Sequence, residues 1–233
     1  MIKKILCALT TAVMTVSMVS CGKNTAEIDY AKDVTDKSVF DSAVDGNTTT
    51  KDNGADMNQW VKVSDYSGKD QQYHNVYLRV TKVTTETDNA DYVEDAVKLN
   101  NKFANENNQI NIKNPKLSDE GEWCVMDYEI YIPDDFPAYD GKVTPTHYSF
   151  DVTDLGDSAD GASSIISFGM GTQKDLIVAE EPEDVEVGKI YSYRFLYAMA
   201  KDHKDYMFTH TQTPLGTKYD EEAELENVYY KSH

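Results

Sequence analysis

One acidic stretch in the second half of the chain holds the densest set of possible metal ligands. Its acids recur three residues apart, as Asp151, Asp154, Asp157 and Asp160. Hard cations such as Ca²⁺ bind about six to eight oxygen ligands, which carboxylates can supply. Because the spacing differs from that of a helix–loop–helix calcium site, two interpretations stay open. One is calcium bound by these four residues, and the other is a solvated turn whose Asp side chains bind backbone amides. No other cofactor is expected.

Signals of nucleophilic or metal-dependent catalysis are weak. The sequence contains neither a Gly-x-Ser-x-Gly elbow nor a His-Glu-x-x-His pair. Cys124 alternates with the apolar residues Met126 and Tyr128, which places its thiol on a buried face where its pKa rises. We therefore predict that the chain is not an enzyme. A surface hydrolase is the last alternative, with Asp134 and Asp135 as its candidate acid pair.

Tyrosine supplies a second route to function, through binding. The chain has 16 Tyr, and tyrosines give recognition surfaces contact area at low entropic cost. We predict a surface patch for a protein or a glycan from tyrosines at strand ends, in loops or on polar faces: Tyr66, Tyr73, Tyr77 and Tyr139, with Tyr219 and Tyr229 as further members. The competing interpretation is that tyrosine simply suits half-buried strands.

The elements that would position these residues are mostly strands. Short runs with a period of two predict half-buried antiparallel strands at 59–66, 76–83, 122–132, 148–152, 165–168, 175–179, 191–199, 206–211 and 227–230. One helix is predicted at about 91–104, because Tyr92, Ala96, Leu99 and Phe103 recur at helical spacing. The fold class is therefore mainly β, an immunoglobulin-like antiparallel β-sandwich with one inserted α-helix.

The first 20 residues have the layout of a secretory signal peptide. Lys3 and Lys4 precede an apolar run that ends at Val19, and this run is shorter than the roughly 20 residues a membrane-spanning helix needs. The sequence Met18-Val19-Ser20-Cys21-Gly22 resembles the bacterial lipoprotein signal. That resemblance implies that Cys21 is acylated and anchors the chain to the membrane, outside the cytoplasm. An ordinary signal peptide with an incidental cysteine is the alternative.

Composition divides the chain after the signal into two parts. Residues 21–58 are polar and lack a sustained period, so we predict a lipidated Cys21 with a flexible, disordered tether, followed by the β-sandwich domain at 59–233. The alternative is a short helix folded onto the domain, marked by Ile28, Tyr30, Val34, Val39 and Phe40. The net charge of −19 argues against nucleic acid as a partner, because phosphate backbones are repelled.

The order of the elements also resembles a family. A lipid anchor, a tether, strands such as 76–83 and 122–132, and a Val187-Gly188-Lys189 turn before an aromatic strand are similar to bacterial surface lipoproteins. The similarity is to those with an extracellular immunoglobulin-like domain of unknown function, akin to immunoprotective antigens. This resemblance implies an exported binding or scaffolding module whose partner is an exported protein or cell-wall glycan. It brings no catalytic residues.

Overall fold

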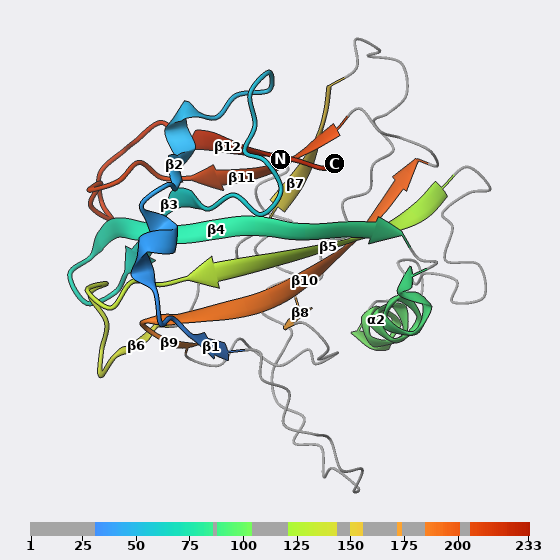
Figure 1. The fold of residues 1–233 in the computed structure, drawn as a ribbon, viewed down its shortest axis with the longest axis horizontal. Coiled ribbons are helices and arrows are strands. Elements are labelled where there is room, and N and C mark those ends of the chain that lie inside the picture. Colours follow the sequence, from blue (N-terminus) through green and yellow to red (C-terminus); the bar gives the residue numbers. More distant parts are fainter. Residues whose placement is uncertain are drawn as a thin grey trace, which may run out of the picture.

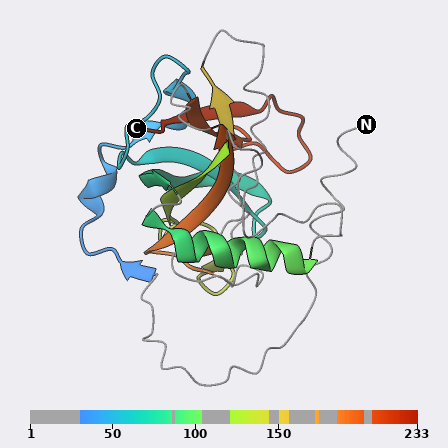
Figure 2. The same ribbon diagram turned by 90° about the vertical axis from the view of Figure 1, so that its right-hand side faces the viewer.

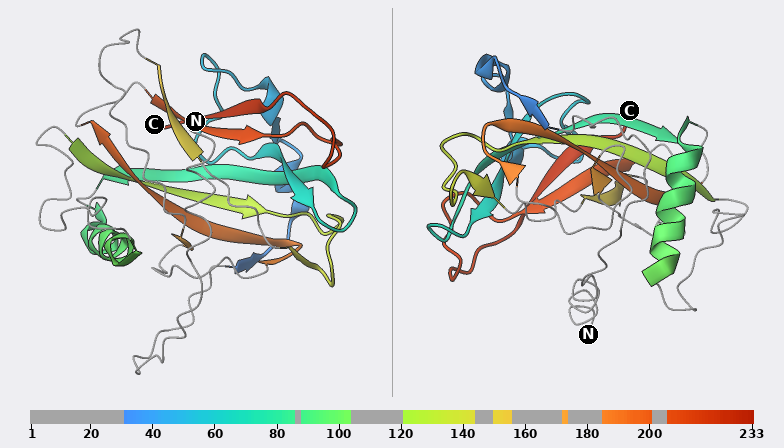
Figure 3. Two further views of the ribbon diagram at one scale, coloured as in Figure 1. Left: turned by 180° about the vertical axis from the view of Figure 1, so that it is seen from behind. Right: turned by 90° about the horizontal axis from the view of Figure 1, so that it is seen from below.

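The computed structural model describes residues 31–85, 88–103, 121–143, 150–155, 172–173, 185–200 and 206–233. A seven-stranded sheet packs against a three-stranded sheet (Figures 1 and 3). The large sheet has the order β1 (Ala31–Asp33), β10 (Lys189–Ala200), β5 (Gly121–Tyr131), β4 (Gln72–Thr85), β3 (Val61–Ser67) and β2 (Val44–Asp45), with β8 (Thr172–Gln173) also paired to β10. The small sheet has the order β12 (Glu226–Lys231), β11 (Tyr206–Gln212) and β7 (Phe150–Asp154). Two short strands, β6 (Lys142–Val143) and β9 (Val185–Glu186), form a separate ribbon.

The main core lies between the two sheets. Alternation along the central strands directs one set of side chains inward, such as Leu78 from β4 and Tyr128 from β5. The small sheet contributes aromatic rings, and the Tyr128 and Phe150 rings meet edge to face at 5.1 Å between centroids. The hydroxyl of Tyr197 donates to the Phe150 carbonyl at 3.1 Å. The mainly-β, sandwich-like fold is therefore confirmed; the pair β2–β3 is parallel, whereas the other neighbours run antiparallel.

One helix covers an end of the outer face of the large sheet. Helix α2 (Ala90–Phe103) agrees with the helix predicted at about 91–104 (Figure 2). Its buried face packs against β5 and β10 through Tyr92, Val93, Ala96 and Val97 against Trp123, Val125 and Leu196. Within the described ranges, no helix has both the length and the apolar character needed to cross a membrane.

The segment before β3 belongs to the domain. Strand β1 pairs antiparallel with β10, and the 3-10 helix η1 (Lys37–Phe40) places the Phe40 ring in a stack on Tyr131, 4.1 Å between centroids. A second 3-10 helix, η2 (Gly46–Thr48), follows β2. The predicted tether is therefore wrong for residues 31–58. The alternative of a short helix folded onto the domain agrees for Lys37–Phe40, whereas Ala31–Asp33 is a strand and Ile28 and Tyr30 lie outside the described residues. A few apolar residues, of which Phe40 is the largest, suffice to dock the segment without creating a periodic pattern.

A row of ion pairs occupies the middle of the same outer face. Asp127 and Glu129 of β5, which alternate with the core residues Met126 and Tyr128, are also buried, at 4% and 7% exposed. Arg194 binds both carboxylate oxygens of Asp127 at 2.6 and 3.0 Å, and Arg79 binds Glu129 at 2.5 and 2.8 Å. Each guanidinium also lies over a ring, Arg79 over Trp60 at 4.3 Å and Arg194 over Tyr92 at 4.9 Å. Helix α2 and the segment 31–58 cover the two ends of this face, whereas Arg79 and Thr81 in its middle stay half-buried.

Candidate functional site

Two loops meet at the end of the sandwich opposite α2. The β3–β4 turn and the loop that joins β11 to β12 lie at the same end in Figure 1. Backbone hydrogen bonds join them: Gly216 N–H donates to the Tyr73 carbonyl at 2.9 Å, and Tyr219 N–H donates to the Gln71 carbonyl at 3.1 Å. The Ser64 hydroxyl also donates to the Thr213 carbonyl. The long loop is therefore held against the hairpin by its own main chain, which fixes the side chains it carries.

Four tyrosines gather at this end and form what we call the tyrosine surface. Tyr66 and Tyr73 belong to the β3–β4 hairpin, Tyr219 to the β11–β12 loop, and Tyr139 to the loop that joins β5 to β6. Tyr66 and Tyr73 are opposite each other in the β3–β4 register, with ring centroids 5.5 Å apart, and the Tyr219 ring lies 5.3 Å from Tyr66. The Tyr139 hydroxyl donates to the Gly68 carbonyl at 3.4 Å. Desolvation, followed by the nearby Tyr219 and Tyr73, raises the pKa of Tyr66, so this phenol stays neutral at physiological pH.

Three of the four tyrosines predicted to bind are thus brought together, and the fourth is not. Tyr77 lies about 13 Å farther along β4 than Tyr73, four residues at the rise of a strand. Its ring contacts Phe40 at 4.8 Å and Tyr131 at 5.9 Å, so Tyr77 is wrong as a member of the patch. Tyr77 does lie on the outer face of β4, opposite the core, as predicted, but the segment 31–58 covers that part of the face. Tyr229 lies in β12, where its backbone N–H donates to Thr49 Oγ1 at 2.9 Å.

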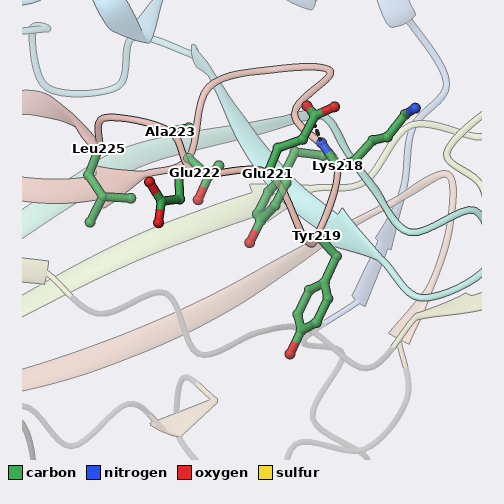
Figure 4. Close-up of a pocket in the computed structure, with 8 residues that line it drawn as sticks. Lys218, Tyr219, Glu221, Glu222, Ala223 and Leu225 are labelled. Atoms are coloured by element: carbon green, nitrogen blue, oxygen red, sulfur yellow. Dashed lines mark hydrogen bonds between the residues drawn. The ribbon is translucent and has the colours of Figure 1, made fainter.

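A groove of about 480 Å³ opens beside the tyrosine surface (Figure 4). Its walls combine rings, aliphatic side chains and carboxylates: Tyr73, Thr213, Lys218, Tyr219, Glu221, Glu222, Ala223 and Leu225. The Glu221 carboxylate accepts a hydrogen bond from the Lys218 backbone N–H at 3.3 Å, which tightens the turn. Lys218 extends away from the Tyr219 ring in Figure 4.

Exposed apolar side chains are concentrated at this end. Across the described residues, six large apolar side chains are exposed. Three of them, Leu215 (51%), Tyr219 (71%) and Leu225 (65%), lie on the β11–β12 loop, and a fourth, Tyr139 (65%), lies on the β5–β6 loop at the same end. Contiguous exposed apolar surface rimmed by polar groups marks interaction sites in soluble domains. Leu215 and Leu225 were not predicted; the signal available in the sequence was two leucines isolated in an otherwise polar loop.

The predicted calcium residues divide between described and undescribed parts of the chain. Asp151 and Asp154 belong to β7, where they pair with Thr209 and Tyr206 of β11, so the expected acidic loop begins as a strand. Asp157 and Asp160 lie outside the described residues. Within the ranges that the structure describes, no group of three or more His, Cys, Asp or Glu is placed to hold a metal ion. Calcium binding by the full set stays a prediction.

The two cysteine predictions also differ in outcome. Cys124 is buried, with its Sγ 3.7 Å from the Tyr206 hydroxyl, and burial raises the pKa of its thiol to about 11. This confirms the expected core position. Cys21, like the whole signal region, lies outside the described residues, so its lipidation stays a prediction.

Comparison of the chain with protein-family models, with curated proteins and with solved structures finds no significant match.

Proposed function

We propose that this protein is a non-enzymatic binding module, held at the outer side of a bacterial membrane by lipid on Cys21. In this proposal the tyrosine surface recognises another exported protein or a component of the cell envelope. The observation that carries it is the concentration of exposed rings and leucines at one end of the sandwich. Three of them lie on the β11–β12 loop, which backbone hydrogen bonds hold to the β3–β4 hairpin, and Tyr139 lies on the β5–β6 loop. Rigid aromatic side chains on a fixed scaffold lose little entropy when they are covered, which suits them to recognition.

The cellular location rests on the sequence. The lysine pair, the short apolar run and Cys21 support export and acylation, and the similarity to immunoglobulin-like surface lipoproteins supports the same role. Two or more acyl chains hold a protein on a bilayer far more firmly than one. Metabolic labelling with an alkyne fatty acid tests the anchor: Cys21→Ala is expected to lose the label and leave the membrane fraction, whereas Cys7→Ala is not.

Site-specific photo-cross-linking in the native cell tests the binding surface. A benzophenone amino acid at position 219 is expected to give a discrete adduct, and the same amino acid at Val39, which is 44% exposed, is the control. Mass spectrometry and glycosidase digestion then identify the adduct as protein or glycan. If both positions give the same diffuse products, or neither gives any, the tyrosine surface is not a recognition site.

A further inference from the structure

We propose that the groove beside the tyrosine surface binds a lysine- and arginine-rich segment of a polypeptide partner. This inference rests on the proposed function, because it names the chemistry of the partner that the tyrosine surface would recognise. It comes from the combination of exposed rings, aliphatic walls and unbalanced negative charge at one place.

The charge around the groove is strongly one-sided. Residues 218–226 contain five acids and one lysine, and Glu221 and Glu222 line the groove itself. Among the described residues that line it, Lys218 carries the only positive charge, and its side chain extends away from Tyr219 (Figure 4). An anionic polymer or a second copy of this acidic chain would be repelled there, whereas a cationic segment would be attracted.

An exposed ring, Tyr219, in the same groove as these carboxylates adds a preference for cationic side chains over neutral groups. A lysine ammonium or an arginine guanidinium gains from contact with a tyrosine face, more so when a carboxylate lies within reach. Tyr219 is 71% exposed and Leu225 is 65% exposed, so a ring face and an aliphatic surface for the side-chain stem are both accessible.

The same chain already holds arginine in this manner twice. Arg79 lies over the Trp60 ring and binds the Glu129 carboxylate, and Arg194 lies over Tyr92 and binds Asp127. The groove presents the same two partners, ring and carboxylate, on the surface. The outer face of the large sheet holds arginines of this chain between rings and carboxylates. The groove is suited to bind basic side chains of another chain through the same kinds of group.

Fluorescence anisotropy on the full chain in mild detergent tests this. The probe is a short fluorescein-labelled peptide in which Lys and Arg alternate with Gly, and the control peptide carries Glu in place of the basic residues. Tyr219→Ala and Glu222→Gln are each expected to weaken binding of the basic peptide about two- to fivefold. Tyr219→Phe, which keeps the ring, is expected to bind like the unchanged protein. Raising NaCl from about 0.05 to 0.5 M is expected to weaken binding by screening.

The matched control for charge is Glu94→Gln on α2, at the opposite end of the molecule (Figure 1). It removes one negative charge from an exposed ion pair, so it should leave both fold and binding unchanged. Equal weakening by Glu94→Gln and Glu222→Gln would show that the peptide is attracted to the whole acidic chain. It would overturn the proposal that the groove is the binding site.

Other outcomes separate this inference from the proposed function. If an N-acetylglucosamine tetrasaccharide binds in a Tyr219-dependent manner by calorimetry and the basic peptide does not, the partner is a neutral glycan and the cationic assignment is overturned. If neither probe binds but cross-linking at position 219 still gives a discrete adduct, only the cationic assignment is overturned. If neither probe binds and no discrete adduct forms, both proposals fail.

Discussion

Replacing Phe40 by Ala tests whether the segment 31–58 is part of the folded domain. The ring is 5% exposed and lies 4.1 Å from Tyr131, 4.8 Å from Tyr77 and 5.0 Å from Trp60. Truncation of a buried Phe costs about 3–5 kcal/mol of unfolding free energy. Because the cluster lies under a surface segment that can relax, we expect a value near the lower limit, about 3 kcal/mol. With a urea m-value of about 2–3 kcal/mol/M, the midpoint should fall by about 1–1.5 M.

Val39→Ala is the matched control, because this neighbouring side chain is 44% exposed and its truncation should change stability by about 0.5 kcal/mol or less. Unfolding is followed by far-UV circular dichroism and by tryptophan fluorescence, since Trp60 reports on the Phe40 cluster. The two transitions should coincide if the segment unfolds with the sheets. A Phe40→Ala midpoint equal to that of Val39→Ala would refute the packing of the segment and restore the tether.

Three further predictions concern the interior. Burial opposes ionisation of Glu129, but Arg79 and Lys32 outweigh this effect and lower the pKa of the carboxyl. The contribution of the ionised Glu129 to folding stability should therefore persist above about pH 4.5 and be lost as the pH falls further. Glu129→Gln should therefore lower the free energy of unfolding, measured in urea melts at pH 7, by about 3 kcal/mol. The stability of this variant should also vary less with pH in the acid range, and parallel stability curves for the variant and the unchanged protein would contradict the ion pair. Gly46→Ala places a Cβ 2.8 Å from the Lys62 carbonyl oxygen and should lower the free energy of unfolding by about 1–3 kcal/mol. Gly68→Ala is the control, because the space around Gly68 is open, and it should lower the free energy less. Equal urea midpoints for the two variants would be inconsistent with the close approach at Gly46. In a Cys7→Ser, Cys21→Ser background, Cys124 should react with Ellman's reagent at pH 8 only as urea unfolds the chain, and rapid reaction without urea would disprove its burial.

The sequence predicts the elements that carry their own periodicity. The alternation in 76–83 and 122–132 and the helical spacing from Tyr92 each reflect which side of a local element meets the core, so these predictions are confirmed. Strands β1 and β2 have three and two residues, too few to show a period, and their partners lie elsewhere in the chain. Their existence depends on tertiary packing, which no local pattern expresses.

In the candidate site, too, some features follow from the local sequence and others depend on tertiary packing. Tyr66 and Tyr73 are neighbours because one hairpin pairs them, a relation that follows from the two strands and the turn between them. Tyr219 joins them because the distant β11–β12 loop binds the hairpin backbone. Tyr77 lies farther along β4, and Phe40 packs on its ring. Exposure of a side chain is decided by whichever segment folds over it, so it is the least predictable property of a binding residue.

The docking of residues 31–58 also changes how far the domain can stand from the membrane. If Cys21 carries the lipid, only ten residue steps separate the anchor from β1, and these span at most about 36 Å even when fully extended. A flexible tether up to residue 58 would reach much farther. Partners of the tyrosine surface should therefore lie close to the bilayer.

Lengthening this connection tests the argument. A Gly/Ser insert of about 20 residues after Lys23 raises the root-mean-square length of the connection from about 17 to about 30 Å, treated as a flexible coil. A dye on Leu225→Cys, a position that is 65% exposed, should then transfer less energy to an acceptor lipid in vesicles, while the urea midpoint stays unchanged. Labelling is selective because the Cys124 thiol is buried and Cys21 would be acylated. Equal energy transfer with and without the insert would show that the domain is held at the membrane by contacts of its own, and the short connection would no longer set its distance.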